Sequence, residues 1–320
     1  MTATATLPPR SEPTSVWARL RPRSGARPTA VSRAEAPPLS PRLQLVRAML
    51  LLVFVLTATL LIQLVLLSSL QHRAAQGRRF DAFREQLAKG TAAIGPVDRA
   101  GYALAAGTPV TFLEIPSIGV SEVIGEGTSA SVLFDGPGHR RDTPLPGQVG
   151  SSVVYGRRAA FGGPFARLGE LQENDLIRVT TGQGTFEYSV IGVRREGDPA
   201  PATLASGGSR LLLVTAAGSA FLPDGVLRVD AEIVGEPVIG AARVLSFSAL
   251  PAEERMMAGD NRTLWVLAFW LQAMIALSVA VVWSWHRWGH AQTWVVFLPT
   301  MLLVGLATSG EFARLLPNLL

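Results

Sequence analysis

The chain has 320 residues and contains no cysteine. Disulfide bonds, thiolate metal sites and any thiol nucleophile are therefore excluded. Histidine is scarce: of the 4 in the chain, only His139 lies between residues 110 and 235. The sequence also lacks the G-x-S-x-G turn of serine hydrolases, the phosphate-binding P-loop and a G-x-G-x-x-G motif after a strand. These absences exclude the common nucleophile elbow and nucleotide-binding loops, and we expect no cofactor.

Charge is spread unevenly along the chain. The formal net charge is +5, and many arginines gather before residue 48. Residues 1–47 combine these arginines with many Pro, Ser, Thr and Ala, which predicts a disordered segment. A nucleic-acid-binding arm is one interpretation. A cytoplasmic tail is favoured, because a membrane span follows directly and basic residues gather on the cytoplasmic side of such spans. We therefore expect no nucleic-acid partner.

Long apolar runs predict three transmembrane helices, one N-terminal and two C-terminal. They cover residues 48–70, 263–285 and 293–310, and about twenty helical residues suffice to cross a hydrocarbon core. The first run is too long for a signal-peptide core, which indicates an uncleaved anchor. At the end of the third run, Glu311 and Arg314 either terminate the helix or form a pair within a longer one. The lipid bilayer is thus an expected partner.

The remaining chain divides into four segments. They are a juxtamembrane helix and stalk (71–109), a folded domain (110–235), a linker (236–262) and a C-terminal tail (311–320). In the stalk, the spacing of apolar residues predicts a helix over Arg78–Lys89 that Gly90 ends. In residues 110–235, short β-branched runs alternate with turn residues, which predicts an all-β, closed barrel.

Two motifs stand out in this domain. The first is G-P-G-H-R-R-D-T-P-L-P-G-Q-V-G-S-S-V-V-Y-G-R-R, from Gly136 to Arg158, within an organising block over Phe134–Leu171. The second is L-L-L-V-T-A, from Leu211 to Ala216. Both resemble motifs of the sortases, cysteine transpeptidases of the Gram-positive cell surface. The resemblance implies a sortase-like barrel outside the plasma membrane, acting on sorting-signal peptides. It fits a multi-pass protein with a cytoplasmic N-terminus and an extracytoplasmic C-terminus.

The resemblance fails at the three catalytic positions. Arg157 stands where sortases have the catalytic histidine, Ala216 where they have the cysteine, and Val226 where they have an arginine. Arg228 is two residues from Val226, so on a strand it would face the same side. Without a thiolate no thioacyl intermediate forms, and a guanidinium neither accepts nor releases a proton near neutral pH. We therefore predict a sortase-like pseudoenzyme with no catalytic residues.

Several interpretations of the altered site stay open. One is a rebuilt, cysteine-independent transpeptidase or hydrolase, in which Thr215 or Ser219 would act with His139. Another is a regulatory subunit of a true sortase. The favoured one is a groove that binds a peptide or another membrane protein of the envelope, with Arg157, Ala216, Thr215, Arg228 and His139 as candidate groove residues.

The two histidines between the last spans have a spacing that can bind metal. His286 and His290 lie four residues apart, a ligand spacing on a helix. However, they flank a glycine at a membrane turn, and the loop holds no carboxylate. We expect no metal site there.

Overall fold

The computed structural model describes residues 40–98, 100–241, 245–287 and 290–320. Residues Leu45–Leu320 form one compact unit. Residues 1–39 of the basic tail expected over residues 1–47 lie outside the described residues, so their disorder stays a prediction. Residues 41–47 already belong to the first helix, so the expected disorder is wrong there.

The first long apolar helix continues into the folded domain without a break. It comprises α1 (Pro41–Leu61), a π-helical turn (Ile62–Leu67) and α2 (Ser68–Ala88). The sequence indicated a separate helix only from Arg78, but no proline interrupts the stretch before it, and the helix runs on. It ends just before Gly90, whose φ of 61° is the left-handed conformation that glycine adopts at helix ends.

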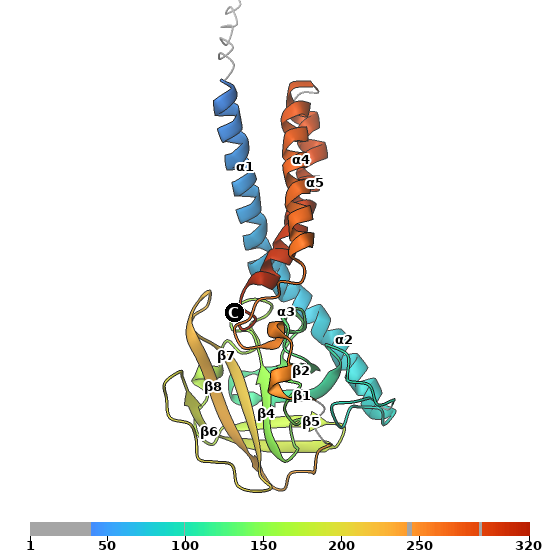
Figure 1. Ribbon diagram of the computed structural model, residues 1–320, viewed down its shortest axis with the longest axis vertical. Helices are drawn as coiled ribbons and strands as arrows, with labels where there is room; N and C mark the ends of the chain where they lie inside the picture. Colours follow the sequence, from blue (N-terminus) through green and yellow to red (C-terminus); the bar gives the residue numbers. More distant parts are fainter. Residues whose placement is uncertain (1–39, 99, 242–244, 288–289) are drawn as a thin grey trace, which may run out of the picture. The chain divides into compact units, whose positions relative to one another are not determined.

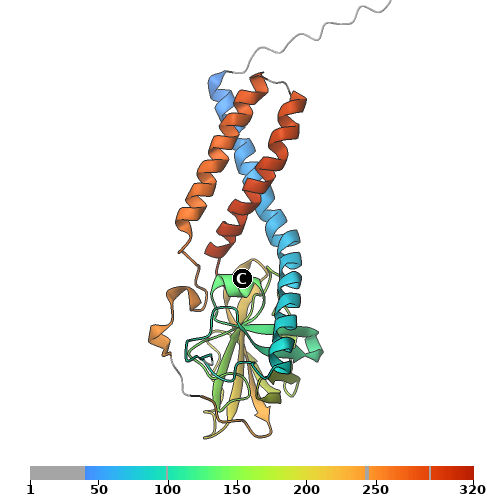
Figure 2. The same ribbon diagram turned by 90° about the vertical axis from the view of Figure 1, so that its right-hand side faces the viewer.

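Polar side chains of α2 bind it to the barrel, along which it runs in Figures 1 and 2. Gln76 accepts a hydrogen bond from the backbone N–H of Val123 at 2.7 Å and donates to the carbonyl of Asp135 at 2.7 Å. The buried Arg79 donates to the carbonyl of Val132 at 3.1 Å. These side chains satisfy backbone groups at the edge of the barrel, as buried polar atoms require.

The domain is a closed barrel of eight strands, which confirms the predicted all-β barrel. The strands are β1 (Pro109–Ile115), β2 (Val120–Glu126), β3 (Gly138–His139), β4 (Gly150–Tyr155), β5 (Leu176–Thr181), β6 (Gly184–Arg194), β7 (Ser209–Ser219) and β8 (Leu222–Val234). Their order around the barrel is β1-β2-β3-β4-β7-β8-β6-β5. The pairs β2–β3 and β4–β7 are parallel. A short helix, α3 (Ala130–Phe134), links β2 to β3.

Alternate residues of β4, β7 and β8 face two different apolar clusters. Leu213 and Val229 belong to the cluster that fills the barrel. Their neighbours on the other face form a second cluster, which contains Val153, Tyr155, Val214, Ala216 and Val226. Successive side chains of a strand point to opposite sides. We call this second side the outer face of β4, β7 and β8.

Two helices follow the barrel: α4 (Leu264–Arg287) and α5 (His290–Leu315). With the first helix they make three helices long and apolar enough to cross a membrane. α5 extends beyond the predicted span, and Glu311 and Arg314 form an ion pair of 3.5 Å within it, so the longer-helix alternative holds. Ser309 of α5 donates to the hydroxyl of Thr59 at 3.2 Å. A hydrogen bond between small residues is a common contact between membrane helices.

Candidate functional site

The three positions at which the sequence departs from the sortase pattern meet at adjacent strand ends. β4 pairs with β7 in parallel up to Tyr155 opposite Val214. The pairing continues through Gly156, whose N–H donates to the carbonyl of Val214 at 3.0 Å. On the other side of β7, Ala216 lies opposite Val226. Residues 157, 216 and 226 therefore come together, although up to about 70 residues separate them in the sequence.

Arg157 is fully buried. Its guanidinium carbon lies 4.7 Å from the ring centroid of Phe134 and 5.2 Å from that of Phe161. Nη1 donates to the carbonyl oxygen of Leu320 at 3.3 Å, while Nε and Nη2 have no hydrogen-bond partner among the described residues. Burial lowers the pKa of Arg157 to about 9. The side chain is thus still a cation at neutral pH, held by two aromatic rings and a carbonyl.

Ala216 and Val226 offer no reactive group. Both are buried in the outer-face cluster, and Leu319 from the end of the chain packs in the same cluster. The space beside Ala216 and Val226 is therefore occupied by an apolar side chain. At these positions the site has a fixed positive charge, and neither a nucleophile nor a base.

Arg228 lies on the outer face, as its spacing from Val226 predicts. It is opposite Val214 in the β7–β8 ladder and is partly exposed. Burial raises the pKa of Tyr155, and the nearby charges of Arg140 and Arg228 act in the opposite direction. Arg228 therefore contributes positive charge to this face without occupying the position of Val226.

Thr215 lies on the other side of β7. It sits between Val214 and Ala216 of the outer-face cluster and in alternation with Leu213 and Ala217 of the barrel interior. Its hydroxyl is buried and has no hydrogen-bond partner among the described residues. The structure thus does not bring Thr215 to the groove. Ser219 is exposed near the β7–β8 turn, where its hydroxyl donates to the carbonyl of Leu222 at 3.2 Å.

His139 belongs to a buried polar network with Glu126 and Thr143, two residues that sequence reasoning missed. Nδ1 of His139 lies 2.9 Å from Oε2 of Glu126, and Nε2 lies 3.1 Å from Oγ1 of Thr143. Nε2 also lies 3.0 Å from the carbonyl oxygen of Pro144. A carbonyl only accepts, so Nε2 carries a proton. The only signal in the sequence was the threonine four residues after the histidine.

A hydroxyl, an imidazole and a carboxylate in a row suggest a catalytic triad, but the hydrogen bonds argue against one. The hydroxyl of Thr143 donates to the carbonyl of Arg140 at 2.7 Å and accepts from the N–H of Val153 at 3.2 Å. A general base must accept the proton of the nucleophile, whereas here Nε2 is a donor. His139 also lies opposite Val154, which faces the barrel interior and not the outer face. The network is structural.

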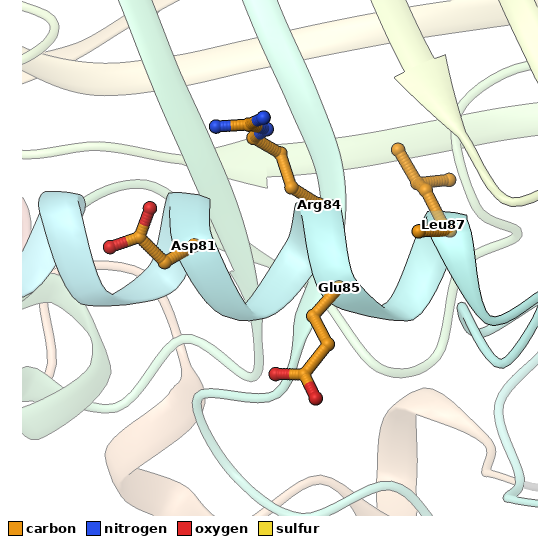
Figure 3. A pocket seen from close by; sticks show the side chains of 5 residues that line it. Asp81, Arg84, Glu85 and Leu87 are labelled. Atoms are coloured by element: carbon orange, nitrogen blue, oxygen red, sulfur yellow. The ribbon is translucent and has the colours of Figure 1, made fainter.

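Two other features do not provide a site. A shallow hollow beside α2, shown in Figure 3, is lined by Asp81, Arg84, Glu85, Leu87 and Ala88. Its charges have both signs and point in different directions. No group of three or more metal-binding side chains occurs among the described residues. Residues 288–289, between His286 and His290, lie outside that part.

The comparisons with known proteins agree on one family. A family model described as a sortase domain matches residues 113–218. Sortase D of Bacillus subtilis (strain 168) is 34% identical over 94 residues, which are 29% of this chain and 46% of that protein. The match thus spans about half the length of this relative.

Solved structures of sortases are also similar to the chain. A sortase D5 transpeptidase of Clostridium perfringens is 21% identical, with 51% of this chain and 99% of that chain covered and a TM-score of 0.41. Sortase C-1 of Actinomyces oris is 28% identical, covering 40% and 75%, with a TM-score of 0.36. Sortase E1 of Streptomyces coelicolor, solved with a tripeptide in its active site, is 26% identical, covering 42% and 93%, with a TM-score of 0.37.

The family match covers both motifs of the sequence, the block from Gly136 to Arg158 and the strand from Leu211 to Ala216, and it falls on the closed barrel. Residues 113–218 therefore match the sortase domain family, and this part of the chain lies in a sortase-like closed barrel.

Proposed function

We propose that this protein is a membrane-anchored, catalytically inactive member of the sortase family, whose domain binds a peptide segment or a membrane partner on the outer side of the cell envelope. One observation carries the proposal. The strand ends that converge at residues 157, 216 and 226 present an arginine, a methyl group and an isopropyl group. The strand ends still converge as in a sortase-type site, but their side chains are unreactive. Such a site can bind a ligand without reacting with it.

The chemistry supports inactivity. A covalent acyl intermediate needs a nucleophile, and the side chain of Ala216 is a methyl group. A positioned acid or base typically contributes a factor of about 10² to 10⁴, but Arg157 is a cation without a transferable proton at neutral pH. The only histidine of the barrel donates through Nε2 to a backbone carbonyl, so no replacement base faces the site.

The activity test uses the full chain in detergent micelles. It is incubated with a fluorescent sorting-type peptide and an amine acceptor, and products are separated by chromatography. We expect neither hydrolysis nor transfer above the rate without protein. A sortase that has its cysteine serves as the positive control under the same conditions. Turnover that is lost on His139→Ala or Thr143→Val would overturn the proposal in favour of a rebuilt enzyme.

The proposed topology places the barrel outside and the turn between α4 and α5 inside. Because the chain has no cysteine, a single cysteine substitution reports on which side of the membrane its position lies. Leu222 is 78% exposed on the barrel, and Arg287 is exposed at the end of α4. In intact cells a membrane-impermeant maleimide should label Leu222→Cys, and it should label Arg287→Cys only after permeabilisation. Labelling of both in intact cells would contradict the proposed orientation.

A further inference from the structure

The outer face of β4, β7 and β8 is covered by the last residues of the same chain, here called the tail segment (residues 316–320). The chain end lies against the barrel after α5 (Figures 1 and 2). Leu319 is completely buried and Leu320 is 5% exposed, although they follow a helix with a largely apolar, exposed surface. Leu319 packs in the cluster that contains Ala216 and Val226.

Two successive arginines hold the backbone of the tail segment. The backbone N–H of Arg158 donates to the carbonyl of Leu319 at 3.0 Å. Nη1 of Arg157 donates to the carbonyl of Leu320 at 3.3 Å. Within the tail segment, the N–H of Leu320 donates to the carbonyl of Pro317 at 3.1 Å, so these residues form a turn and not an extended strand. Main-chain hydrogen bonds and a pocket for an apolar side chain are contacts by which folded domains bind peptide segments. The tail segment has the contacts of a bound peptide.

Asn318 fixes the register of the tail segment. It is fully buried, and its Nδ2 donates to the carbonyls of Thr128 at 3.0 Å and Arg255 at 2.9 Å. Its backbone N–H donates to the carbonyl of Ala258 at 2.9 Å. One side-chain amide thus joins the tail segment both to the barrel and to the linker before α4. A side chain with no N–H groups could not form these bonds.

The altered side chains of the site fit this occupant. Leu319 packs in the same buried cluster as Ala216 and Val226, where a long polar side chain would compete for volume. The oxygen that Nη1 of Arg157 reaches belongs to the tail segment. A buried cation without any oxygen partner would be more costly.

We propose that the sortase-type site of this chain is a peptide-binding groove whose ligand is the chain's own Asn318-Leu319-Leu320. This segment closes the groove and ties α5 to the barrel, so another peptide can enter only when the tail segment leaves. The proposal rests on the assignment of the site made above, but not on the absence of acyl transfer.

Thiol reactivity tests the proposal in the full chain in detergent. Ala216→Cys introduces the only thiol, at a position that the tail segment covers. Its labelling by maleimide should be slower by about 100-fold or more than that of Leu222→Cys, because it requires local opening. Adding Asn318→Asp keeps the shape of the side chain but turns the two N–H donors into an oxygen that faces two carbonyls. The labelling of Ala216→Cys should then rise by about tenfold or more.

Labelling of Leu222→Cys in the Asn318→Asp background is the matched control and should not change. A crosslink keeps the proposal testable if Asn318→Asp disturbs folding. In the Ala216→Cys, Leu319→Cys variant with an otherwise native tail, a short bifunctional thiol-reactive reagent should join the tryptic peptide that spans 211–228 to the one that begins at Leu315, once slow local opening has admitted the reagent.

Two outcomes would overturn the proposal: labelling of Ala216→Cys as fast as that of Leu222→Cys with the tail intact, or no crosslink to the peptide from Leu315. Neither readout depends on turnover. An open groove in an inactive protein would overturn only the proposal that the tail segment closes the groove. A closed groove in an active protein would overturn only the proposed inactivity.

Discussion

The Arg157→Glu variant is expected to lose roughly 3–5 kcal/mol of unfolding free energy, the range found when a buried charge is left without compensation. Phe134 and Phe161 present ring faces to this side chain at 4.7 and 5.2 Å. Those faces carry negative partial charge, which attracts a guanidinium and repels a carboxylate. The carbonyl of Leu320, which now accepts from Nη1, would also face an acceptor. Denaturant titration of the detergent-solubilised chain measures the loss.

Two further variants separate charge from volume. Arg157→Met keeps much of the volume and removes a cation whose burial opposes folding, as its lowered pKa indicates. Its unfolding free energy should stay within about 1.5 kcal/mol of the wild type. Arg167→Glu makes the same charge reversal at an exposed arginine and should cost far less unfolding free energy than Arg157→Glu. Equal losses in Arg157→Glu and Arg167→Glu would contradict the buried, ring-bound position of Arg157.

The sequence predicted the barrel and the convergence of the site because both depend on local patterns. The block ending at Arg157 and the strand ending at Ala216 carry motifs whose relative placement follows from the family fold. The identities of the residues at these positions then indicated what chemistry is absent. The structure adds that Thr215 faces the barrel interior while its neighbour Ala216 faces outward, a difference that follows from strand alternation.

The position of the tail segment over the site could not be predicted from the sequence. Leu320 is 163 residues from Arg157, and the tail segment is too short to have a periodic pattern. Strand β3 was also missed, because two residues, Gly138 and His139, give no alternation to detect. Gly138 shows why β3 begins with glycine. A Cβ there would lie 2.2 Å from the carbonyl oxygen of Gly127, which follows β2, and no local rule reveals this contact.

The second large effect concerns the pair of Glu126 and His139, whose side chains are 3% and 2% exposed. Because Nε2 of His139 donates to the carbonyl of Pro144, only Nδ1 is left for Glu126, and the two groups share one proton across 2.9 Å. Removing either partner leaves the other buried without its hydrogen bond. Glu126→Ala and His139→Ala should therefore each lose roughly 3–5 kcal/mol of unfolding free energy.

The double variant distinguishes a coupled structural pair from two independent side chains. Once one partner is absent, the other is a buried polar group without its hydrogen bond, and removing it as well removes that cost. The double variant should therefore lose less unfolding free energy than the sum of the two single losses, by roughly 1–3 kcal/mol. Thr143→Val is the matched control, because it removes one contact to Nε2 and leaves the pair intact. Strictly additive losses would show that the two side chains act separately. Since the pair lies on the inward side of β3 and not on the outer face, its removal should change stability while the protection of residue 216 in the folded fraction stays as it was.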